Sequence, residues 1–109
     1  MTLDKESCTS CKADAPRVSA KEAKELLKQL PGWSIVKRGG EARLEKSFEF
    51  KDFQKALDFS NKIGRMAQKQ DHHPALLTEW GSVTVTWWTH KIRGLHRNDF
   101  VAAAKTEKL

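Results

Sequence analysis

Long apolar runs are missing from this chain of 109 residues. No stretch approaches the roughly 20 apolar residues that a helix needs to cross a bilayer, and no leader-like apolar segment lies near Met1. We therefore expect a cytoplasmic protein that does not bind a membrane. The length fits one domain built around one hydrophobic core.

Cysteine is scarce, because only Cys8 and Cys11 occur. Their Cys-x-x-Cys spacing could form half of a zinc site, but no second Cys or His pair lies at a suitable spacing. A redox dithiol usually begins a helix after a strand, whereas this pair lies in a polar N-terminal segment. We interpret residues 1–17 as a flexible tail and residues 18–109 as the single folded domain.

Acidic residues are in the minority: the chain has 20 Lys and Arg but only 14 Asp and Glu, which gives a formal net charge of +6. Such a balance permits an anionic partner. Acids interleave with the bases, however, as in Lys21-Glu22 and Lys24-Glu25, so we expect no nucleic-acid binding. The densest basic stretch, residues 91–97, could equally hold an anionic part of a small ligand.

The hydrophobic periodicity predicts three helices and two β-hairpins. The first helix starts at a capping box on Ser19 and ends at Pro31-Gly32. The expected strands are residues 33–38, a return strand through Phe50, residues 75–80 and residues 82–90; the other helices are residues 52–69 and a last helix capped by Asn98. This order, α-β-β-α-β-β-α, predicts an α+β domain in which a four-stranded antiparallel sheet has its helices packed on one face.

The long helix has more apolar surface than one sheet needs. Phe59, Ile63 and Met66 widen its apolar stripe to about half of the circumference, whereas a helix that packs only on a sheet needs a face of roughly 100°. We therefore expect contact with a neighbouring helix or a partner subunit, in a homodimer or a homotetramer.

Three of the four histidines are the most informative residues, whereas we expect the fourth, His96, to lie at the surface. His72 and His73 follow Asp71 and precede a proline, His90 ends the last predicted strand, and Asp99 follows nine residues later. Histidine titrates near physiological pH, so three histidines and a carboxylate suggest proton transfer. Alternatively, the His-His pair caps a helix end, the three histidines bind zinc, and Asp99 is an acid in the first turn of a helix.

Strand alternation places Trp88 and His90 on the same, open face of the sheet as Thr84 and Thr86. A flat ligand could lie against Trp88 and form a hydrogen bond with His90. The alternative is that Trp88 packs against a neighbouring strand or subunit.

The spacing of these residues resembles a known signature. His72-His73-Pro74, five residues, Trp80, nine residues, His90, eight residues and Asp99 is similar to the pattern of pterin-4a-carbinolamine dehydratases. The resemblance implies a hydro-lyase that removes water from a 4a-hydroxytetrahydropterin and yields the quinonoid dihydropterin. Such an enzyme recycles the pterin cofactor of aromatic amino-acid hydroxylases, and it needs no cofactor of its own. The resemblance also leaves room for a catalytically weak pterin-binding protein, or a dimerisation or coactivator protein of the same fold.

The same resemblance implies roles for individual residues. His72, His73 and His90 would form the proton-transfer cluster, and Asp99 is carried over as a site residue. The flanking positions that would contact the pterin are Asp71, Trp88, Thr89 and Lys91. Gln68 departs from the family pattern, which usually has an ionisable residue four positions before the first histidine. Glutamine cannot carry a charge, so we expect His72 to be less basic than a carboxylate at this position would make it.

Metal independence is the first testable prediction. We expect full dehydration activity after exhaustive treatment with a chelator, because the elimination needs only proton transfers. The measurement is the initial rate before and after chelation. Loss of activity that zinc restores would instead favour the three-histidine metal site.

Overall fold

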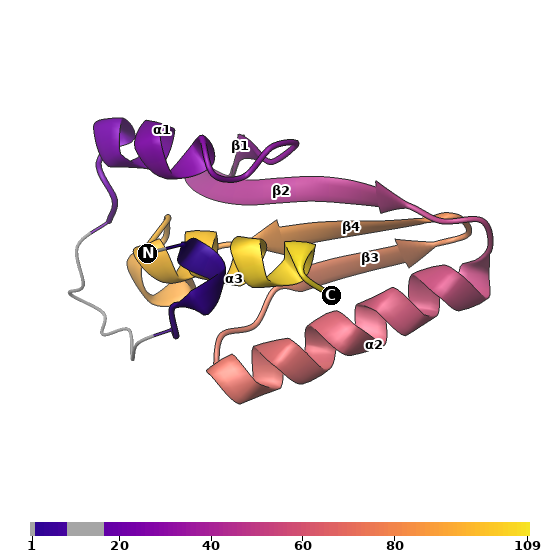
Figure 1. Cartoon of the computed structure of the whole chain (residues 1–109). Coiled ribbons are helices and arrows are strands. Elements are labelled where there is room, and N and C mark those ends of the chain that lie inside the picture. The colour runs from indigo at the N-terminus through magenta and orange to yellow at the C-terminus, as the bar shows by residue number, and fades with distance from the viewer. Residues whose placement is uncertain (1, 9–16) are drawn as a thin grey trace.

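A computed structural model describes residues 2–8 and 17–109 of the chain (Figure 1). The elements in chain order are η1 (Leu3–Lys5), α1 (Ala20–Leu27), β1 (Ser34–Arg38), β2 (Glu41–Glu49), α2 (Phe53–Gln70), β3 (Ala75–Glu79), β4 (Ser82–Trp87), η2 (His90–Ile92) and α3 (Arg97–Glu107). The predicted α+β class and the order of the three helices and four strands are confirmed. The two short 3-10 helices, η1 and η2, were not predicted.

The sheet is antiparallel throughout, with the strand order β1-β2-β4-β3. Gly39 and Gly40 have φ angles of 59° and 80°, and Gly81 has a φ angle of 80°. This left-handed backbone suits glycine and produces the tight turns of the two hairpins. The two central strands, β2 and β4, pair from Leu44 opposite Trp87 to Glu49 opposite Ser82.

The hydrophobic core lies between the sheet and its helices. Leu44, Val83, Val85 and Trp87 alternate along the central strands and are fully buried. The helices α2 and α3 both contact β4, and a hydrogen bond of 2.6 Å between the hydroxyls of Ser60 in α2 and Thr78 in β3 also joins helix to sheet. Strand alternation therefore predicted the buried face correctly.

The apolar stripe of α2 divides into a buried part and an exposed part. The buried residues of the helix are Ala56, Phe59, Ser60, Ile63 and Ala67. Phe53 and Leu57, one helical turn apart, remain 45% and 36% exposed. The half-circumference width of the stripe is thus only partly explained by packing within the chain. Within the described ranges, no helix is both long enough and apolar enough to cross a membrane.

The C-terminal third differs from the prediction in two places. Strand β4 ends at Trp87 rather than at residue 90, because Thr89 pairs with Gly94 in an isolated bridge and the chain turns into η2. The residue that caps α3 is His96 rather than Asn98: its ring Nδ1 accepts a hydrogen bond of 3.0 Å from the backbone N–H of Asn98. Asn98 lies within the first turn of α3 and is buried.

Part of the predicted tail packs against the domain. Leu3 is 1% exposed and belongs to the core, and η1 contacts α3. The carboxylate of Glu6 forms a bidentate ion pair with Arg97, with N–O distances of 2.9 and 2.8 Å. Residues 2–8 therefore differ from the expected loose segment, because one apolar side chain is buried there. Cys11 lies outside the described residues.

Leu3 gives a stability prediction. Leu3→Ala should lower the free energy of unfolding by about 2–5 kcal/mol, as expected when a buried leucine is truncated. Leu77→Ala is the control, because Leu77 is 57% exposed. Urea unfolding of both variants measures the difference. A change for Leu3→Ala no larger than that for Leu77→Ala would mean that the N-terminal segment does not contribute to the core.

Candidate functional site

The end of α2 fixes the direction of the two adjacent histidines. Asp71 terminates the helix in a left-handed conformation, with a φ angle of 52°, and its backbone N–H donates to the carbonyl oxygens of Ala67 and Gln68. The backbone N–H of His72 then donates to the carbonyl of Ala67 at 3.2 Å. This turn directs the chain from the helix into β3 and places His72 against the core, while His73 remains exposed.

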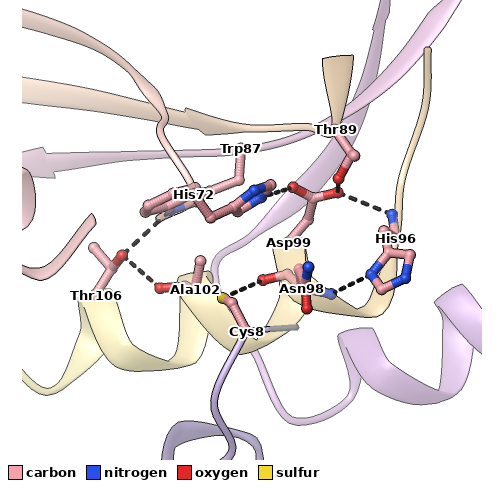
Figure 2. A network of polar contacts seen from close by, with 9 residues as sticks. All are labelled: Cys8, His72, Trp87, Thr89, His96, Asn98, Asp99, Ala102 and Thr106. Atoms are coloured by element: carbon pink, nitrogen blue, oxygen red, sulfur yellow. Dashed lines mark hydrogen bonds and ion pairs between the residues drawn. The ribbon is translucent and has the colours of Figure 1, made fainter. Parts of the chain in front are cut away.

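Asp99 is a fully buried carboxylate that accepts three hydrogen bonds (Figure 2). Its Oδ1 accepts from Nε2 of His72 at 2.6 Å. Its Oδ2 accepts from the hydroxyl of Thr89 at 2.8 Å and from the backbone N–H of His96 at 2.9 Å. A buried charge is tolerated when it is hydrogen-bonded in this way. Three separate segments therefore converge on one side chain.

Asp99 has a structural role and a second role at the same time. One oxygen completes the capping box of α3, as an acid in the first turn of a helix should. The other oxygen holds His72. The helix-cap explanation for Asp99 is thus correct but incomplete, because a cap alone does not require contact with a histidine 27 residues away.

The contact with Asp99 also selects the tautomer of His72. A carboxylate only accepts hydrogen bonds, so Nε2 carries the proton, and Nδ1 is the basic nitrogen of the neutral ring. The ring stacks on the indole of Trp87, with centroids 5.6 Å apart and planes inclined by 12°. The Trp87 N–H in turn donates to the hydroxyl of Thr106 at 3.3 Å. The imidazole is therefore held both at its edge and on one face.

Gln68 contacts His73 rather than His72. Its side-chain oxygen lies 3.0 Å from Nε2 of His73. Four residues of continuous helix would have placed positions 68 and 72 on one face. The left-handed turn at Asp71 interrupts that geometry, so Gln68 forms its hydrogen bond with His73. The expected effect of Gln68 on His72 is therefore not supported by a direct hydrogen bond between them.

Trp88, His90 and Arg43 form a second cluster. The rings of Trp88 and His90 have centroids 4.5 Å apart, and the guanidinium carbon of Arg43 lies 4.0 Å from the centroid of the Trp88 ring. Trp88 is 9% exposed, whereas His90 is exposed in η2 rather than placed in a strand. Arg43 lies on the predicted polar face of β2, and nothing in the sequence indicated its contact with Trp88.

The other predicted site residues have simpler surroundings. Thr89 is 3% exposed and links the Asp99 cluster to the Trp88 cluster. It directly follows Trp88 in the sequence, and its hydroxyl donates to Asp99. Asp71 and Lys91 have exposed side chains. Across residues 2–8 and 17–109, no three His, Cys, Asp or Glu side chains converge in a way that could hold a metal ion.

His96 and Cys8 lie beside the hydrogen-bonded cluster of His72, Thr89 and Asp99, and neither was predicted to do so (Figure 2). His96 was expected at the surface but is half-buried as the cap of α3. The Cys8 thiol is half-buried and donates to the carbonyl of Asn98 at 3.7 Å. Burial, with a smaller contribution from the charge of Asp99, raises the pKa of Cys8 to about 11.

Comparisons with known proteins show the family of this chain. Residues 16–109 match the family described as pterin 4 alpha carbinolamine dehydratase. The chain belongs to this family. It is also 55% identical over 109 residues to a protein of Gloeobacter violaceus named "Putative pterin-4-alpha-carbinolamine dehydratase 1", covering 100% of this chain and 94% of the relative.

A solved structure supports the same assignment. The crystal structure of a transcriptional coactivator/pterin dehydratase from Brucella melitensis superposes with a TM-score of 0.78 at 34% identity. The similarity covers 85% of this chain and 97% of the Brucella chain. Family and relative together identify a hydro-lyase of the pterin-4a-carbinolamine dehydratase type, so the recognition made from the histidine spacing is confirmed.

The raised pKa of Cys8 gives a prediction about its reactivity. In a Cys11→Ser variant, the alkylation rate of Cys8 should continue to increase up to about pH 11, because only the thiolate reacts. An unperturbed cysteine would level off above roughly pH 8.5. The measurement is the pH dependence of iodoacetamide labelling, with the urea-unfolded variant as control. A plateau at the same pH in both states would show that the thiol is not buried.

Proposed function

We propose that the hydro-lyase acts by histidine acid–base catalysis on a 4a-hydroxytetrahydropterin, with His72 as the base and His90 as the acid. The contact between His72 and the buried carboxylate of Asp99 is the observation that carries this proposal. That contact occupies Nε2 of His72 and leaves Nδ1 as the nitrogen that can take a proton from the substrate.

The reaction needs only two proton transfers. The base removes the proton from N5 of the pterin, and its electron pair forms the C4a=N5 double bond. The C4a–O bond breaks, and the acid protonates the departing hydroxide to give water and the quinonoid dihydropterin. Positioned acids and bases of this kind contribute rate factors of ~10²–10⁴.

The remaining residues would bind and orient the pterin. Trp88 would support His90 and Arg43 at the edge of the site, since its ring contacts both, and the hydroxyl of Thr89 fixes Asp99. His73, held by Gln68, would position the substrate rather than transfer its proton. Asp71 and Lys91 flank the histidines and would contact polar edges of the pterin. Recycling of the cofactor of aromatic amino-acid hydroxylases, in the cytoplasm, is the cellular role that fits this reaction.

The histidine assignment predicts a clear order among variants. His72→Gln and His90→Ala should each lower kcat/KM for dehydration by ~10²-fold or more, because glutamine can still donate to Asp99 but cannot transfer a proton. His96→Asn is the matched control, since asparagine preserves the cap of α3. The measurement is stopped-flow dehydration of freshly prepared 4a-hydroxypterin.

Two outcomes of that experiment would contradict the proposal. If His96→Asn reduces kcat/KM as much as His90→Ala does, the second cluster does not contain the acid. If the unmodified protein binds the pterin but does not accelerate its dehydration, the catalytically weak binding protein is the correct description. Thermal unfolding of each variant separates loss of chemistry from loss of fold.

The exposed stripe of α2 supports a homodimer or homotetramer. Phe53 and Leu57 lie one turn apart and present apolar surface to solvent. We expect sedimentation to show a dimer or tetramer at micromolar concentration and Leu57→Lys to shift it towards monomer. Leu109→Lys, at an apolar residue 42% exposed at the C-terminus, should leave the assembly unchanged. A stable monomer of the unmodified protein would contradict the proposal.

A further inference from the structure

A groove of about 700 Å³ lies between α1 and the β1–β2 hairpin, with Arg93, Gly94 and Leu95 on its wall. This volume is in the range of small-molecule sites, which is roughly 300–1,000 Å³. The groove contains none of the residues assigned to dehydration, so it is a separate feature of the domain.

The floor of the groove is apolar because α1 does not cover the whole hairpin. Ile35 pairs with Leu44 and therefore lies on the helix side of the sheet, yet Ile35 is 38% exposed and Leu44 is 0% exposed. Leu27 of α1 also lines the groove, and the small side chains of Ala23 and Ala42 leave space between helix and strands.

The charged residues that line the groove are all cationic. They are Arg17, Lys21, Lys24, Lys37 and Arg93. Among the described lining residues there is no carboxylate to neutralise them. Such an excess of one sign over an apolar floor attracts an anion that also has an apolar part.

Most of these cations lie towards one end of the groove. The chain turns back between α1 and β1 over residues 28–33, and the start of β2 lies beside α1 (Figure 1). Lys21 lies in the first turn of α1, and Arg17 precedes the helix and donates to the carbonyl of Ile92, next to Arg93, so these three cations lie at one end. The positive end of the α1 dipole adds to their charge. Leu27 and Ile35 lie further along the groove.

The wall at the cationic end is held rigidly. The backbone N–H of Val18 donates to the carbonyl of Leu95 at 2.9 Å, and Nε of Arg17 donates to the carbonyl of Ile92 at 2.7 Å. A Cβ atom at Gly94 would lie 3.0 Å from Cδ of Arg17, so a larger residue there would require the Arg17 side chain to move. A preformed wall lowers the entropic cost of binding.

We infer that this groove binds a small amphipathic carboxylate, with its acidic head among the lining cations, which include Lys21, Lys37 and Arg93, and its apolar body along Leu27 and Ile35. A polyphosphate would leave the apolar floor unused, and a neutral apolar molecule would leave the cations without a partner. A single acidic head with an apolar body satisfies both parts of the groove.

The test is an NMR titration of the full-length chain with decanoate, monitored through backbone amides. We expect saturable shifts at Ala23, Ala42, Gly94 and Leu95. Decylamine has the same apolar chain with the opposite charge, and it should cause no saturable shift at these amides. The readout is binding rather than dehydration, so the result does not depend on the function proposed for the histidines.

Variants test the orientation of the ligand. Lys37→Glu combined with Arg93→Asn should weaken decanoate binding about tenfold, since charge-assisted contacts are lost. Asparagine tolerates the left-handed φ angle of 52° at residue 93. Ile35→Ser should also weaken binding. Lys62→Glu combined with Lys69→Glu is the matched control, because these lysines line a different hollow, and the affinity should change less than twofold.

Three results would overturn the inference. The first is decylamine binding as tight as decanoate binding, and the second is shifts located away from the groove. The third is tighter binding of an acidic amphipathic peptide than of decanoate, which would make the groove a protein-docking surface instead.

Discussion

The buried carboxylate of Asp99 is the interaction on which the rest of the site depends. Its three donors come from the segment after α2, the segment after β4 and the start of α3. A buried charge without hydrogen bonds would cost several kcal/mol, so the carboxylate requires these segments to stay together. The same contact orients His72 and fixes its tautomer. The same side chain therefore both caps α3 and orients the proposed base.

The sequence predicted the elements well where local signals were strong. Ser19 caps α1, Asp52 caps α2, and the glycines at positions 39, 40 and 81 form turns, as each residue type favours. The prediction was wrong where a residue type that rarely caps a helix or adopts a left-handed conformation does so. Histidine is not a preferred N-cap residue, whereas asparagine is, so the sequence predicted a cap at Asn98, two residues after the observed cap at His96. The left-handed Arg93, which closes the turn after η2, has no sequence signal either.

Only part of the candidate site could be predicted, because its contacts join segments that lie far apart in the sequence. The spacing of the histidines and Asp99 resembled a family pattern, but spacing alone could not show that His72 would touch Asp99 across 27 residues. Spacing also could not show that the turn at Asp71 allows Gln68 to form a hydrogen bond with His73. Nor could it show that Arg43 lies over the ring of Trp88. Contacts between segments depend on the packed sheet, which no local pattern describes.

The tautomer of His72 tests the central claim most directly. Nitrogen-15 NMR of the histidine side chains distinguishes a protonated Nε2 from a protonated Nδ1. The account predicts that neutral His72 carries its proton on Nε2 and that Asp99→Ala abolishes this preference. A neutral His72 protonated on Nδ1 in the unmodified protein, or a tautomer that does not change in Asp99→Ala, would contradict the account.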